Sequence, residues 1–155
     1  MQIPDEERLV VERRITNRVF NYWQELCANR RMPREEDIDP DILGDDWPNC
    51  FLLQTRDIDH IEQFNFTYLG ENILQSYKNA GIDADNLFLV GPNVFALAPR
   101  FIHVAQTGKP LMDEGIFFTS RDVKILYRQC LLPLSSKDKR VEAIFGAMLF
   151  KTEAK

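Results

Sequence analysis

The chain has 155 residues, a formal net charge of −5 and 45% hydrophobic residues. These values predict one globular domain with a core that needs no disulfide, and the negative charge speaks against a nucleic-acid partner. No run of about 20 apolar residues is present, so we expect no membrane contact. The acidic N-terminus and the three widely spaced cysteines predict a cytoplasmic location.

An amphipathic helix is expected at the start of the chain. Pro4 suits a first helical turn, and Asn29 and Pro33 are suitable end points. Its apolar stripe consists of Ile15, Val19, Tyr22, Trp23 and Leu26. Within a single domain covering 1–155, we therefore distinguish an N-terminal helix (1–31), an acidic linker (32–48) and a core (49–151).

Two strands, two helical segments and three strands are expected to follow. Residues 50–55 and 63–69 form an antiparallel hairpin, with Phe64, Phe66 and Tyr68 on one face because side chains alternate along a strand. Helical patterns cover 71–80 and 93–107, and Pro99 should kink or split the second. The last three strands are expected at 115–120, 123–132 and 141–150.

The final strand is apolar on both faces. Val141, Ala143, Phe145, Ala147 and Leu149 lie on one face, and Ile144, Met148 and Phe150 fill most of the other. An antiparallel sheet with one wet face would alternate between apolar and polar residues. Both faces must therefore be covered, one by the central helices and the other by the N-terminal helix or a second copy of the chain.

Six short segments, in order, resemble the opening, the middle and the last strands of a stand-alone bacterial PAS domain family found chiefly in alphaproteobacteria. They are Tyr22 to Leu26, Met32-Pro33 with Ile38 to Pro40, Phe51 to Leu53, Phe66 to Gly70, Thr107 to Pro110, and Leu131 to Leu134 with Gly146 to Leu149. Thr67 stands where that family often has arginine. The resemblance covers about residues 20–150.

The resemblance implies an α+β fold, in which a five-stranded antiparallel sheet carries a central helical block and an N-terminal amphipathic helix. It also implies a sensory signalling module and not an enzyme. Because no output domain follows, we expect it to act by binding a small molecule, an unknown signalling protein, or both, as a homodimer through the helical stripe listed above. The alternative is a cone-shaped α+β pocket protein with isomerase-like or carrier activity.

A ligand pocket between the sheet and the helices is a further expectation. Its candidate lining consists of Phe66, Tyr68, Tyr77, Phe95, Phe117, Tyr127, Cys130 and Met148. The alternative is that these side chains only fill the core, since a domain of this size needs its aromatic residues for packing.

Cofactors and catalytic groups are not expected from the motifs. His103 is a conceivable haem ligand, but it lies off the apolar stripe of its helix, so haem is unlikely. The segment from Asn49 to Gln54 resembles a flavin-photoreceptor motif, but its arginine is missing and it lies in an expected strand, so flavin is also judged unlikely. No catalytic triad, phosphate loop or metal-ligand spacing is found.

Overall fold

The computed structural model describes residues 5–55, 64–81, 92–118 and 121–153, without the side chains of 5–10, 12, 64, 92–96 and 98. The chain begins with helix α1 (Asp5–Cys27), and its linker contains three short helices. These are η1 (Glu35–Asp37), α2 (Pro40–Leu43) and η2 (Gly44–Asn49). No helix in the described ranges is long and apolar enough to cross a membrane.

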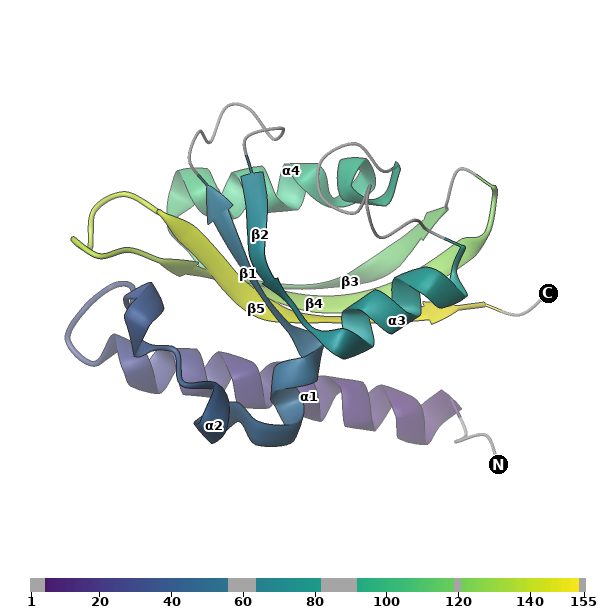
Figure 1. Cartoon of the computed structure of the whole chain (residues 1–155), viewed down its shortest axis with the longest axis horizontal. Coiled ribbons are helices and arrows are strands. Elements are labelled where there is room, and N and C mark those ends of the chain that lie inside the picture. Colours follow the sequence, from purple (N-terminus) through teal and green to yellow (C-terminus); the bar gives the residue numbers. More distant parts are fainter. Residues whose placement is uncertain (1–4, 56–63, 82–91, 119–120, 154–155) are drawn as a thin grey trace.

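The core is a five-stranded antiparallel sheet (Figure 1). Strands β1 (Cys50–Thr55) and β2 (Phe64–Leu69) are followed by helices α3 (Glu71–Asn79) and α4 (Pro92–Thr107). The chain then forms β3 (Leu111–Phe118), β4 (Lys124–Leu134) and β5 (Ala143–Thr152). The strand order is β2-β1-β5-β4-β3, so the last strand lies at the centre. The expected α+β architecture is confirmed.

Both faces of the sheet are covered, as the apolar pattern of β5 predicts. Ile144 and Met148 belong to the core facing α3 and α4, whereas Ala143, Phe145 and Ala147 belong to a second core facing α1. All five side chains are at most 2% exposed. One strand therefore separates two hydrophobic cores.

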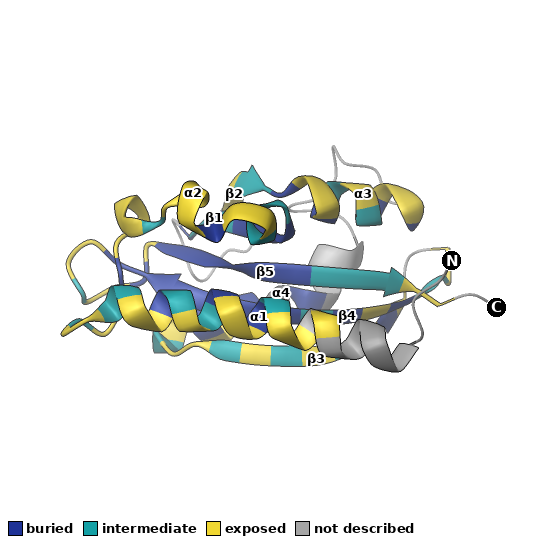
Figure 2. Ribbon diagram, turned by 90° about the horizontal axis from the view of Figure 1, so that it is seen from below, coloured by how far each residue is buried: buried dark blue, intermediate teal, exposed yellow. Residues whose placement is uncertain are grey.

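Helix α1 of the same chain covers the second face (Figures 1 and 2). Val19 and Trp23 are buried there, and Trp23 Nε1 donates a hydrogen bond to the carbonyl oxygen of Pro133 in β4 at 2.9 Å. Arg18 holds the helix to η2 through two bonds to the carboxylate of Asp46, at 2.8 and 2.7 Å. The chain thus supplies its own cover without a second copy.

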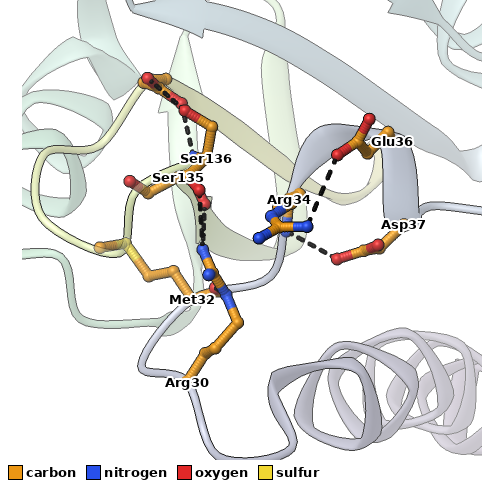
Figure 3. Close-up of polar contacts among 8 residues, drawn as sticks. Arg30, Met32, Arg34, Glu36, Asp37, Ser135 and Ser136 are labelled. Carbon is orange, nitrogen blue, oxygen red and sulfur yellow. Dashed lines mark hydrogen bonds and ion pairs between the residues drawn. The ribbon is translucent and has the colours of Figure 1, made fainter.

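The residues after α1 are tied to the loop between β4 and β5, and we call these contacts the linker clamp (Figure 3). The Arg30 guanidinium donates to the carbonyl oxygens of Met32, Ser135 and Ser136 at 2.8–3.2 Å. On the same loop, the Asp138 carboxylate accepts from the backbone N–H groups of Arg31 and Met32, at 3.1 and 2.9 Å. The clamp joins segments more than a hundred residues apart in sequence.

The expectation that Phe66 and Tyr68 share a face is wrong because the hairpin contains a β-bulge. Leu52 pairs with Tyr68 and Leu53 pairs with Phe66, so Thr67 is an extra residue between them. A bulge of this kind shifts the side-chain alternation by one. Phe66 therefore packs in the core facing α4, whereas Tyr68 packs on the α1 side.

Two other boundaries differ from expectation. Strand β3 begins at Leu111 and not at Gly115. Asp113 and Glu114 are poor strand formers by propensity, but their carboxylates bond to the β4 side chains of Tyr127 and Arg128, which stabilises the earlier start. Helix α4 continues through Pro99 as one element, so of the two expected outcomes, a kink or a split, the split is wrong. The loop predicted at 57–60 lies outside the described residues.

Candidate functional site

A group of four polar side chains lies on the sheet face that packs against α4, and we call it the inner polar cluster. It consists of Arg100, Asp113, Tyr127 and Gln129. The β3–β4 register places Asp113 opposite Gln129 and Gly115 opposite Tyr127. Cross-strand neighbours share a face of the sheet, so these side chains meet by strand pairing alone. Arg100 reaches them from α4.

The Asp113 carboxylate is the centre of the inner polar cluster. Its Oδ2 accepts from the Tyr127 hydroxyl at 2.9 Å and from Gln129 Nε2 at 3.3 Å, and it pairs with Arg100 Nε at 2.5 Å. The Arg100 guanidinium also lies 5.7 Å from the centroid of the Tyr127 ring, within cation–π range. Three donors therefore converge on one carboxylate.

The Tyr127 hydroxyl stays protonated beside Asp113 and so remains a hydrogen-bond donor. Burial, together with the hydrogen bond to Asp113 and its charge, raises the pKa of Tyr127 to about 12, against the opposing effect of Arg100. A side chain at position 115 would crowd this ring, since a Cβ there would lie 3.0 Å from the Tyr127 hydroxyl. Glycine at 115 thus leaves the room that Tyr127 needs to reach Asp113.

The side-chain oxygen of Gln129 has no hydrogen-bond partner among the described residues, although the residue is only 1% exposed. A buried polar atom of this kind is uncommon in a folded protein. The amide cannot simply be reversed, because its oxygen would then face the Asp113 carboxylate, which is also an acceptor. The unpaired Gln129 oxygen is therefore a buried acceptor that a hydrogen-bond donor could satisfy.

A row of aromatic side chains extends from Tyr127 of the inner polar cluster. Ring centroids lie 5.8 Å apart for Phe117 and Tyr127, 6.0 Å for Phe117 and Phe150, and 5.1 Å for Phe150 and Tyr77. The row runs from α3 across β5 and β3 to β4. It gives the polar cluster an apolar wall, as ligand-binding sites commonly have.

The structure brings together five of the eight expected pocket residues. They are Phe66, Tyr77, Phe117, Tyr127 and Met148. Tyr68 and Cys130 lie on the α1 side instead, the first because of the bulge and the second because it is three residues from Tyr127 along a strand. The side chain of Phe95 lies outside the described residues.

The expected interface residues of α1 are divided between buried and partly exposed positions. Val19 and Trp23 are 0% and 5% exposed within the single chain. Ile15, Tyr22 and Leu26 are half-buried. The two most buried residues of the stripe are thus committed to the chain's own sheet.

Sequence reasoning missed Gln129, Asp113 and Arg100. A signal for Gln129 was present, since it falls on the same strand face as Tyr127 and Leu131, where an apolar residue is expected. His103 is exposed on α4, beside the buried Val104. No group of three or more His, Cys, Asp or Glu side chains that could hold a metal is present in the described ranges.

A family model for the PAS domain matches residues 11–73 of this chain. No curated protein matches it. Solved structures similar to this chain include the LOV protein of Rhodobacter sphaeroides, with 12% identity, a TM-score of 0.46 and coverage of 65% of this chain and 57% of that one. The light state of the blue-light photoreceptor Aureochrome1 LOV has 9% identity, a TM-score of 0.45 and coverages of 70% and 84%. A variant of Vivid has 12% identity, a TM-score of 0.45 and coverages of 84% and 93%.

The chain therefore has the α+β fold of PAS domains, and it spans only about half the length of the Rhodobacter chain. The expectation that flavin is unlikely is corrected by the comparison, because the similar structures are LOV domains, a class that binds flavin.

The flavin-like segment does not supply a thiol to the inner polar cluster. Cys50 begins β1, and its side chain packs with Cys130 in the core facing α1. Cys27 also packs against that core. Burial raises the pKa of both Cys50 and Cys130. All three cysteines thus lie on the side of the sheet away from α4, and a flavin beside the inner polar cluster would contact no thiol of the described residues.

Proposed function

We propose that this chain is a sensory signalling module that binds a small molecule at the inner polar cluster and that acts by binding and not by catalysis. The PAS fold supports the sensory part of the proposal. The unpaired side-chain oxygen of Gln129 is the observation that carries the ligand part. A buried group without a partner costs about 1–3 kcal/mol, which a ligand donor would recover.

The chemistry of the ligand follows from the groups around Gln129. Asp113 accepts from its three neighbours through Oδ2, and the buried acceptor of the cluster that has no partner is the Gln129 oxygen, which needs an N–H or O–H donor. The aromatic row favours a flat or apolar body next to that donor. We therefore expect a small aromatic or heterocyclic molecule with a ring N–H or a hydroxyl group.

Native mass spectrometry of the purified protein, with an absorption spectrum recorded in parallel, tests this proposal. We expect a bound small-molecule mass in the wild-type protein and its loss in Gln129→Leu. The Gln75→Leu variant makes the same chemical change on an exposed position of α3 and should keep the mass. Visible absorbance that accompanies the bound mass would identify the ligand as a chromophore.

Stability provides an independent reading of the same variant. In the ligand-stripped protein, Gln129→Leu should raise the free energy of unfolding by less than about 1 kcal/mol, because the gain from removing an unsatisfied buried acceptor is partly offset by loss of the 3.3 Å hydrogen bond to Asp113. Urea unfolding followed by circular dichroism measures this difference. If the wild type carries no bound mass and Gln129→Leu is less stable than the wild type, Gln129 is structural and the proposal fails.

We further propose that two copies associate through the face of β3 that lies beside α1. Met112, Ile116 and Phe118 project from this face and are 43–55% exposed. The charged residue between them, Glu114, is paired with Arg128. Two such rows can therefore meet without like charges facing each other, which suits contact about a two-fold axis.

A further inference from the structure

A groove of about 290 Å³ runs between α1 and α2, on the side of the sheet opposite α4. Figure 2 shows these two helices with β5 visible between them. Arg18, Tyr22 and Glu25 line the groove from α1, and Ile42, Leu43 and Asp46 line it from the linker. The inner polar cluster is on the other side of the sheet, so the groove is a separate surface.

Ile42 forms an apolar rim on this groove. It is 68% exposed, more than any other large hydrophobic side chain in the described ranges. The helix that carries it is held at both ends. Asp39 accepts a hydrogen bond from the Asp41 N–H at 3.0 Å as an N-cap, and Gly44 ends α2 with a φ of 52°. Ile42 is therefore presented by an ordered turn.

The walls of the groove are fixed to each other. The Tyr22 hydroxyl accepts from the Asp39 N–H at 2.7 Å and donates to the Asp37 carbonyl oxygen at 3.3 Å. Burial raises the pKa of Tyr22, so the hydroxyl keeps the proton that it donates. Together with the Arg18–Asp46 pair, these bonds set the spacing of α1 and the linker. A preformed surface binds with a smaller loss of conformational entropy.

The rim of the groove carries negative charge. The positive charge of Arg18 is compensated by its ion pair with Asp46. Glu25 lines the groove, and Asp41 and Asp45 are the sequence neighbours of its lining residues Ile42 and Asp46. All three are exposed, and within the described part of the chain none of them forms an ion pair. A second copy would bring the same negative rim against this one and be repelled, whereas a basic partner would be attracted.

We propose that this groove is a docking site for a basic segment of a partner protein. One large apolar side chain of the segment packs against Ile42 and Tyr22, and flanking Lys or Arg residues lie near Glu25, Asp41 and Asp45. The proposal rests on the proposed signalling function only in its premise that the module has a protein partner.

Fluorescence anisotropy with a labelled amphipathic peptide of Lys and Leu tests this assignment. We expect binding that weakens as salt is added, and an affinity lowered about tenfold by Ile42→Ser or by Asp45→Lys. Two controls match these changes outside the groove: Val11→Ser on α1, at an exposed position, and Glu153→Lys after β5 should each leave the affinity within about twofold of wild type.

A companion peptide in which every Lys is replaced by Glu should not bind. Equal binding of the two peptides, no binding of the basic one, or an affinity that Ile42→Ser leaves unchanged would each overturn the proposal. So would a change in the association state of Ile42→Ser in sedimentation equilibrium, since the groove would then hold a second copy.

The two proposals can fail separately. The small-molecule mass in native spectra should be the same for Ile42→Ser and wild type, because the groove and the inner polar cluster lie on opposite sides of the sheet. Gln129→Leu should in turn bind the basic peptide like the wild type. Loss of the bound mass in Ile42→Ser would show that the two surfaces are not independent and would contradict the assignment of a separate docking site.

Discussion

Gly146 occupies the centre of the sheet, where no side chain fits. A Cβ at this position would overlap the carbonyl oxygen of Cys130 and lie 3.0 Å from the Phe51 ring. Gly44 presents the opposite case, because its surroundings are open and only its φ of 52° disfavours other residues.

Alanine at these two glycines should therefore have unequal effects. We expect Gly146→Ala to lower the free energy of unfolding by about 3 kcal/mol or more, since β4 and β5 must separate. Gly44→Ala should cost about 1–3 kcal/mol through backbone strain alone. Urea unfolding of both variants measures the difference, and equal stabilities would show that the sheet yields easily around Gly146.

For single residues, the sequence predicts which side chains are buried better than it predicts which groups those side chains contact. Tyr127 was expected in the pocket for its aromatic ring, yet its hydroxyl has the more specific role, as a donor to Asp113. That role depends on the β3–β4 register, which places Asp113 next to Gln129. Register is a property of two strands together, so the inner polar cluster could not be derived from either strand alone.

The linker clamp is a contact between elements whose strength depends on pH. The backbone N–H groups of Arg31 and Met32 hold the pKa of Asp138 below its usual value. A lowered folded-state pKa means that the stabilisation is complete above the pKa of the unfolded chain. It is lost as the pH falls through the folded-state value.

Comparison of the wild type with Asp138→Asn isolates this charge. Asn tolerates the φ of 58° at this position, so the backbone should be unchanged. The wild type should be more stable at neutral pH, and the gap in free energy of unfolding should close below about pH 4. Urea unfolding across this pH range measures it. Asp122→Asn, at a φ of 62° and without these bonds, is the control, and its gap should not vary in the same way.

Element order, the β1–β2 hairpin and the double cover of the sheet follow from the sequence, because periodicity and apolar content are local properties. The bulge at Thr67 does not follow from them, since a single extra residue leaves the alternation of Phe66 and Tyr68 intact in the sequence while separating them in space. As a result of the bulge, Tyr68 stacks on Trp47 on the α1 side of the sheet, with ring centroids 4.0 Å apart.

At the scale of the whole molecule, association through β3 is the property to measure. Ile116→Asp places a charge in the middle of the exposed apolar row and should weaken self-association at least about tenfold, because a charge is costly to bury at an interface. Sedimentation equilibrium reports the change. Ile42→Asp makes the same substitution in the groove between α1 and α2 and should leave self-association unaltered. The reverse pattern would place the contact between copies on α1 and α2.

The central position of β5 has a consequence for how substitutions accumulate in this chain. Neighbouring residues such as Ile144 and Phe145 serve different cores, so the strand has no outward side on which a change is free. A residue that enlarges one core presses on a backbone whose other side is already filled. The two faces of the sheet must therefore vary in concert, because a change beside the inner polar cluster requires compensating changes among the residues packed beneath α1.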